Sequence, residues 1–208
     1  MKIAMITTYS TPSVCGVWQV VFEHAKRLVQ KGHEVHIFTS NVIKNTTQIS
    51  PSYQNVEGMH IHRFPKIMTL PGDALYFSFK KELKQLKPDI IHTHSYRHVH
   101  SYTVLQSAKK LKIPCFLTTH APFVDKKLRS PVANLIVKMY DLFLKKTLNE
   151  YTKVCAIANW EIPYLLRLGL RKEKIIILTT GVSKEFFKKT RPGRKILYMG
   201  RIADIKDV

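Results

Sequence analysis

The segment KIAMITTYSTPSVCGVWQVVFEHAKRLVQKGHEVHIFT, residues 2–39, holds two short apolar runs separated by a longer amphipathic stretch. The runs Lys2–Thr8 and Glu34–Thr39 have the length and composition of buried strands. Between them apolar residues recur at helical spacing, and Gly32 supplies the left-handed backbone that ends a helix. The apolar helical positions are Val17, Val20, Val21, Ala25, Leu28 and Val29. A strand, a helix and a second strand in this order predict a parallel β-α-β unit.

The same alternation continues along most of the 208 residues. Further predicted strands are Met59–Phe64, Asp89–His94, Cys115–His120, Lys153–Ala158 and Lys174–Thr179. Apolar strands separated by helices are typical of a parallel sheet that is covered on both faces. We therefore predict an α/β fold, a Rossmann-like doubly wound parallel sheet, over residues 1–187.

Two helices and one loop complete this prediction. In Leu75–Leu86, apolar side chains fall on one helical stripe, and Ser130-Pro131 has the form of an N-cap and first-turn proline. The helix that follows Pro131 should run to about Asn149. By contrast, Ile43–Gly58 is polar and lacks periodicity, which indicates an exposed loop.

The composition restricts the partners and the location of the chain. Lys and Arg number 34 against 14 Asp and Glu, a formal charge of +20, which favours anionic partners. Aromatic residues are not interleaved with the cations as a nucleic-acid platform requires, so we expect no nucleic acid. Three widely spaced cysteines fit a reducing cytoplasm. No apolar run is long enough to span a bilayer, so any membrane contact should be peripheral, on the inner face.

Ligands of doubly wound sheets bind beyond the carboxyl ends of the strands, which directs attention to the segments that follow them. The first of these ends at Gly16, where the first helix begins and where a glycine allows an anion to approach the helix N-terminus. A tight turn explains the same glycine equally well, since no G-x-G-x-x-G pattern is present. The other segments are His94–His100, His120–Asp125, Asn159–Glu161 and Thr180–Ser183.

The stretch PDIIHTHSYRHVH, residues 88–100, is rich in histidine. His92 and His94 share one face of a strand, and His120 ends the next strand. A structural role for these imidazoles outweighs a zinc site, because the usual thiolate or carboxylate ligands are missing and the spacing is not that of a helix or hairpin site. We expect no metal and no cofactor.

Basic residues flank two predicted helices. They are Lys80, Lys81, Lys84 and Lys87 on the first, and Lys126, Lys127, Arg129, Lys138, Lys145 and Lys146 around the second. Basic side chains beside an amphipathic helix are attracted to an anionic membrane surface, and a solvated helix face is an equally good explanation.

The C-terminal segment KILYMGRIADIKDV, residues 195–208, reads as the first strand of another unit, with cations at Arg201 and Lys206. A basic stretch rich in proline and glycine, residues 188–194, has the character of an interdomain linker. We expect residues 195–208 to open a second, truncated domain.

Taken in order, several segments resemble the N-terminal half of a group 1 (family 4) glycosyltransferase with the two-domain GT-B fold. They are the glycine loop, first helix and second strand GVWQVVFEHAKRLVQKGHEVHIFT, then KPDIIHTHSYRH, IPCFLTTH, VCAIANWEIPYLLRLGLRKEKIIILTTGVSKEFF and KILYMGRIADIK. The resemblance extends over nearly the whole chain. It implies a retaining enzyme whose donor is a nucleotide-diphosphate sugar.

The resemblance also implies roles for matching positions. His120 is similar to the histidine that faces the transferred sugar, and Gly16 to the loop glycine near the donor diphosphate. Arg201 and Lys206 resemble the cation pair that grips the diphosphate without a metal. Residues expected on the acceptor side are Tyr9, Ser10, His94, Tyr96 and Arg97.

The expected acceptor is a lipid or glycan, reached at an anionic membrane surface. Because the paired glutamates of the second domain are absent from the 208 residues, we expect the isolated chain to be inactive. The alternative is a non-catalytic binding module that docks on a membrane or on a separately encoded C-terminal half.

Overall fold

The computed structural model describes residues 1–70, 74–123, 127, 129–181, 187 and 193. The predicted second domain, with Arg201 and Lys206, lies outside the described residues, as does all of the predicted linker except Gly193. No described helix combines the length and the apolar character needed to cross a bilayer.

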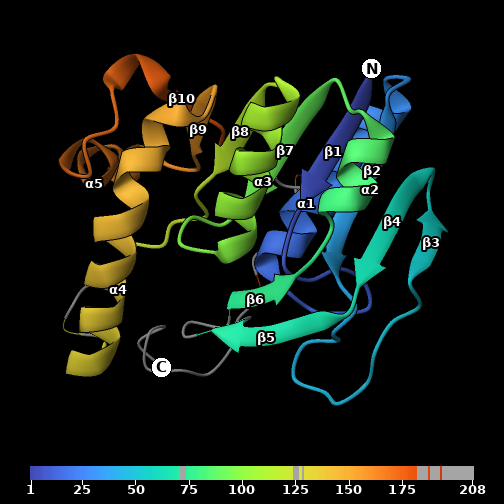
Figure 1. The fold of residues 1–208 in the computed structure, drawn as a ribbon, viewed down its shortest axis with the longest axis horizontal. Coiled ribbons are helices and arrows are strands. Elements are labelled where there is room, and N and C mark those ends of the chain that lie inside the picture. The colour runs from blue at the N-terminus through green and yellow to red at the C-terminus, as the bar shows by residue number, and fades with distance from the viewer. Residues whose placement is uncertain (71–73, 124–126, 128, 182–186, 188–192, 194–208) are drawn as a thin grey trace.

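One large sheet organises the molecule (Figure 1). Its strand order is β10-β9-β8-β7-β1-β2-β4-β3, and every neighbouring pair is parallel except β3 and β4. The strands are β1 (Lys2–Ile6), β2 (Glu34–Ser40), β3 (Tyr53–Val56), β4 (Met59–Phe64), β7 (Ile90–His94), β8 (Cys115–Thr118), β9 (Lys153–Ala156) and β10 (Ile175–Ile177). This confirms the predicted Rossmann-like parallel sheet.

Helices cover both faces of the sheet. Helix α1 (Gly16–Gln30) packs Val21 and Ala25 against Val35 and Ile37 on one face. Alternate residues of β2 point the other way, so Phe38 enters the second core beneath α2 (Lys80–Leu86) and α3 (Val99–Leu111). The remaining helical elements are α4 (Pro131–Leu144), η2 (Lys145–Glu150), η3 (Asn159–Glu161), α5 (Ile162–Arg167) and η4 (Lys172–Lys174).

Two predictions on the β2 side of the sheet were wrong. The expected loop over residues 43–58 contains β3, which pairs antiparallel with β4 from Tyr53↔His62 to Val56↔Met59. A two-residue turn joins them, with positive φ at Glu57 and Gly58, as a type I′ turn requires. A β-carbon at Gly58 would lie 2.8 Å from Val29 Cγ1, so packing against α1 also favours glycine there.

The expected helix over residues 75–86 is two elements. Ala74–Phe77 forms strand β6, paired with β5 (Lys66–Leu70), and only Lys80–Leu86 forms the helix α2. The predicted stripe of Phe79, Leu83 and Leu86 belongs to α2 and its N-cap, and packs on one core together with Phe77 of β6.

Helix α4 begins as expected and ends earlier. Ser130 caps it, because its Oγ accepts a hydrogen bond from the Ala133 amide at 3.2 Å, and Pro131 occupies the first turn. The helix ends at Leu144, and the tighter η2 turn follows and brings Leu148 into the core. In Figure 1, α4 stands beside β9 at one end of the molecule, far from β3. None of its own residues is buried.

Candidate functional site

The carboxyl ends of β1, β7, β8 and β9 lie side by side. The sheet register pairs Thr93 with Leu117 and His94 with Thr118, so the end of β7 meets the end of β8. His120 follows β8 by two residues, and its Nε2 lies 2.9 Å from Nδ1 of His94. The predicted acceptor-side residue and the predicted sugar-facing residue are therefore directly hydrogen-bonded.

The backbone around His120 is held in an unusual conformation. His120 and Ala121 have φ of 57° and 51°, the left-handed region that residues with a side chain seldom occupy. The Tyr96 amide donates to the Thr119 carbonyl at 3.3 Å, and the Thr119 hydroxyl donates to the Glu161 carboxylate. Glu161 also accepts from the Ile157 amide at 3.1 Å, so the segment before His120 is tied to the loop after β9.

Burial keeps these imidazoles neutral. It lowers the pKa of His120 to about 4, and it lowers the pKa of His94 well below its ordinary value. His92 and His100 are affected in the same way, each with a pKa of about 3.

Three other histidines of the sequence motif have separate partners. His92 Nε2 lies 2.8 Å from the Thr118 hydroxyl, His100 Nε2 donates to the His94 carbonyl at 2.8 Å, and His98 Nδ1 lies 3.2 Å from the Thr8 hydroxyl. In the described part of the chain, no group of three or more His, Cys, Asp or Glu side chains is arranged to hold a metal ion.

The loop after β1 lies across the same edge. Tyr9 and Ser10 are almost fully buried, and the Ser10 hydroxyl accepts from Arg63 Nε at 2.9 Å. Tyr9 lines a cavity of about 210 Å³, whose other lining residues are Thr7, Thr8, Cys15, Val17, Lys44, Ser95 and His98. Gly16 is the first residue of α1, and nothing lies within 4 Å of where its β-carbon would stand. Among the described residues, the position of a side chain at Gly16 is therefore unoccupied.

Tyr96 and Arg97 contact α4 and Phe123 rather than the His94–His120 pair. The Arg97 guanidinium makes a two-bond pair with Asp141 of α4, both distances 2.8 Å, and donates to the Pro122 carbonyl at 2.7 Å. Tyr96 is buried beside it, and burial together with the Asp141 charge raises the pKa of its phenol. These two predicted acceptor-side residues therefore lie beside Asp141, in the last turn of α4.

A larger cavity of about 700 Å³ opens between α4 and α5. Phe123 and Tyr164 stack in its wall with ring centres 5.1 Å apart, and the Arg97 and Arg167 guanidinium groups lie over these rings at 5.3 and 5.7 Å. Its lining also includes Arg129, Asn134, Leu135, Val137, Lys138, Asp141 and Leu168. The cavity therefore combines aromatic surface with several cations.

Sequence reasoning gave no role to Glu161, Arg63 or Asp141. Each is a buried or half-buried charged residue that holds a loop of the site. Glu161 falls within the segment Asn159–Glu161 named above, whereas Arg63 and Asp141 belong to no quoted motif. Arg63 donates to Ser10, to the Thr11 and Pro51 carbonyls and to Gln54. One signal was available. Arg63 lies near the carboxyl end of a predicted strand, the edge at which doubly wound sheets bind ligands.

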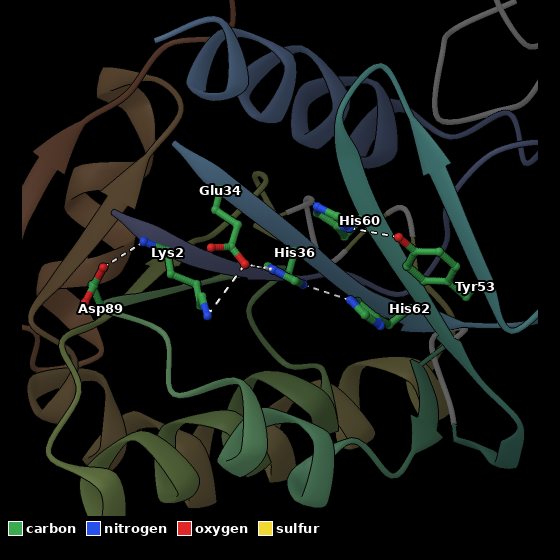
Figure 2. A network of polar contacts seen from close by, with 7 residues as sticks. All are labelled: Lys2, Glu34, His36, Tyr53, His60, His62 and Asp89. Carbon is green, nitrogen blue, oxygen red and sulfur yellow. Dashed lines mark hydrogen bonds and ion pairs between the residues drawn. The ribbon is translucent and has the colours of Figure 1, made fainter. Parts of the chain in front are cut away.

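A second group of imidazoles lies on β2 and β4, and Figure 2 shows it from close by. His36 Nδ1 is 2.9 Å from His62 Nε2, and the other His36 nitrogen is 2.8 Å from Glu34. His60 stacks on His36 with ring centres 4.7 Å apart and pairs with the Tyr53 hydroxyl at 2.8 Å. These contacts join β3 to the sheet through side chains and are remote from the His94–His120 pair in the strand order.

A parallel sheet with this strand order, with its loops gathered at the carboxyl edge, defines a Rossmann-like domain of the GT-B N-terminal type. The profile of Glycosyltransferase Family 4 matches residues 14–186. The chain therefore belongs to Glycosyltransferase Family 4.

Individual relatives agree with this assignment. The chain is 26% identical over 207 residues to an alpha-monoglucosyldiacylglycerol synthase of Acholeplasma laidlawii, covering 94% of this chain and 50% of the relative. Its fold matches sucrose-phosphate synthase from Thermosynechococcus elongatus with a TM-score of 0.61 at 15% identity, covering 87% of this chain and 48% of that one. HepE of Anabaena in complex with UDP-glucose gives 0.58 at 11% identity, covering 91% and 46%. The chain thus spans about half the length of the proteins it matches.

Proposed function

We propose that this chain is the acceptor-side part of a retaining glycosyltransferase that moves a sugar from a nucleotide-diphosphate sugar to a lipid or glycan acceptor. The observation that carries the proposal is the His94–His120 hydrogen bond at the carboxyl edge of the sheet. His120 contacts the transferred sugar, and the N-terminus of α1 at Gly16, where a helix favours an anion, receives the donor phosphates. Arg201 and Lys206, which lie outside the described residues, are the proposed diphosphate ligands, because cations stabilise the leaving group without a metal.

The choice of donor is supported by the relatives. HepE has the same fold in this half, and its structure holds UDP-glucose. The Acholeplasma relative is named for a glucosylated diacylglycerol, which favours a lipid acceptor for this chain as well.

A nucleotide titration followed by NMR tests the donor site. Adding UDP-glucose to the ¹⁵N-labelled chain should shift the amides of Gly16 and Val17 and the imidazole of His120. The matched variant is Gly16→Ala: its added methyl group meets no atom in this structure and favours the helix, while it narrows the approach of a phosphate. Unchanged spectra on adding millimolar UDP-glucose, or an equal response from the variant, would contradict the proposed donor site.

We further propose that the acceptor is met at an anionic membrane surface, on the cytoplasmic side, through α4. Apolar side chains of α4 face solvent, with Leu135 61% and Phe143 68% exposed. Val132, Met139 and Leu142 are exposed as well, at spacings of three and four residues. Arg129, Lys138, Lys145 and Lys146 lie on or beside the helix. Each cation near an anionic surface contributes about 1 kcal/mol.

Sedimentation with lipid vesicles tests the membrane contact. The chain should bind vesicles that contain phosphatidylglycerol, bind neutral phosphatidylcholine vesicles much less, and be released by salt. The double variant Leu135→Ser with Phe143→Ser should bind weakly, whereas Ile67→Ser, an equally exposed apolar residue on β5, should not change binding. Equal sedimentation with both kinds of vesicle would remove this part of the proposal.

A further inference from the structure

Within the described residues, one ring nitrogen of His94 makes a hydrogen bond and the other makes none. The His94 side chain is fully buried, and its Nδ1 is 2.9 Å from His120 Nε2. Its Nε2 has no hydrogen-bond partner among the described residues. Neighbouring groups are engaged elsewhere, since His92 pairs with Thr118 and His100 donates to the His94 carbonyl.

This asymmetry decides where the proton of the His94 ring lies. A neutral imidazole carries one N–H, on either nitrogen. If the proton were on Nε2, a buried donor would have no acceptor, and orphaned N–H groups are rarer in proteins than unused lone pairs. With the proton on Nδ1, the N–H donates to His120 Nε2, and only a lone pair remains unused.

The tautomer of His94 then determines that of His120. Since His120 Nε2 accepts a hydrogen bond, the proton of the neutral His120 ring must be on Nδ1. We infer that His94 is a positioning residue that holds His120 as the Nδ1–H tautomer. His120 therefore offers a hydrogen-bond donor, and its Nε2 lone pair is occupied and cannot act as a base.

The surroundings preserve this arrangement at neutral pH. Four imidazoles act on the pair, those of His24, His92, His98 and His100, and a positive charge on any of them disfavours protonation of the pair. The nearby carboxylate, Glu161, accepts hydrogen bonds from Thr119 and the Ile157 amide. Burial lowers the pKa of both members, so the pair carries one proton per ring.

The consequence for the reaction rests on the proposed function. An Nδ1–H group on His120 is suited to donate to a hydroxyl or ring oxygen of the transferred sugar, which orients the sugar without removing a proton from it. Within the described residues, Nδ1 of His120 has no hydrogen-bond partner, so the donor is available to a ligand.

The test reads the tautomer directly, on the chain labelled with ¹⁵N-histidine at neutral pH. Two-bond proton–nitrogen correlation spectra distinguish a protonated ring nitrogen from one with a lone pair. In the unmodified chain, Nδ1 of His120 should be protonated and Nε2 should not. A spectrum with the proton on Nε2 would overturn the inference.

Variants separate positioning from a merely structural role. His94→Leu removes the donor, so the His120 ring should shift toward the Nε2–H form. His94→Asn places an amide N–H near the position of Nδ1 and should restore the Nδ1–H form. Thr118→Val breaks the His92 contact and leaves the pair intact, so His120 should not change. An unchanged His120 tautomer in a folded His94→Leu chain would refute the role of His94, even if UDP-glucose binds as proposed.

Discussion

Acidification should destabilise the folded chain through its buried imidazoles. Histidines whose pKa is lowered by folding bind a proton in the unfolded state at a pH where the folded state does not. Stability is therefore complete above the ordinary histidine pKa of 6.5 and is lost as the pH falls from there toward the folded values. His62 and His120 reach their folded pKa at about 4, and His92 and His100 at about 3.

His92 and His100, whose folded pKa values are both about 3, give the magnitude. From 6.5 to about pH 5 is about 1.5 units, and each unit is worth about 1.4 kcal/mol per group, so each contributes about 2 kcal/mol. Their sum is about 4 kcal/mol. Domains are typically stable by roughly 5–15 kcal/mol, so this sum is a large part of the total. Burial also lowers the pKa of His62, His94 and His120, so these residues act in the same direction. Glu161 opposes them, because burial raises the pKa of its carboxyl.

Urea unfolding at a series of pH values measures this loss. The free energy of unfolding should fall between about pH 6.5 and about pH 5. Its slope against pH should correspond to the uptake of roughly two or more protons on unfolding. His100→Gln keeps an amide that can donate to the His94 carbonyl and removes one titrating group, so its slope should be smaller by about one proton. Comparing both chains above about pH 7.5 isolates the packing cost of the substitution. A stability that is constant across this range, or an unchanged slope in the variant, would refute the reasoning.

Three further predictions concern contacts that hold the site. Arg63→Met removes four hydrogen bonds to the loops around Ser10 and should lower the free energy of unfolding by about 2–4 kcal/mol in urea titrations. Leu83→Ala, at a fully buried position, should cost about 2–5 kcal/mol in the same assay, whereas the exposed Leu135→Ala should cost under about 0.5 kcal/mol. Arg97→Lys cannot reproduce the two-bond pair with Asp141, so it should lower the melting temperature, while the double variant Arg97→Leu with Asp141→Leu should lower it less.

The strands of the parallel sheet could be predicted because each has its own local signal, a short apolar or alternating run. Most of these runs are buried, whereas β10 is apolar but largely exposed. The edge strand β3 has no such signal. Its sequence YQNV is polar and mostly exposed, and pairing with β4 determines its conformation. The Glu57-Gly58 turn was the available clue. Strand β6 was missed for the opposite reason, since Leu75 and Phe77 of the strand and Leu83 of α2 are buried in one core, and the whole segment has the apolar content of a single helix.

The candidate site was partly predictable. Spacing on a strand placed His92 and His94 on one face, and strand order brought His94 beside His120. The Asp141 partner of Arg97 could not be found in this way, because Arg97 lies in the turn after β7 and Asp141 lies 44 residues further along the chain, on α4. Contacts between distant loops depend on side-chain packing, which sequence periodicity does not encode.

The chain carries a formal charge of +20, and the cations that we propose to meet a membrane lie in a different part of the molecule from the His94–His120 pair. The ionisable groups that influence His120 are imidazoles, whereas the cations of α4 lie at the end of the molecule beside β9. Membrane affinity and the tautomer of His120 should therefore vary independently. Leu135→Ser with Phe143→Ser should weaken vesicle binding and leave the His120 tautomer unchanged. His94→Leu should change the His120 tautomer and leave vesicle binding unchanged. If a substitution on α4 altered the His120 spectrum in the absence of lipid, the two functions would be coupled through Arg97 and Asp141, which join α4 to the loop after β7.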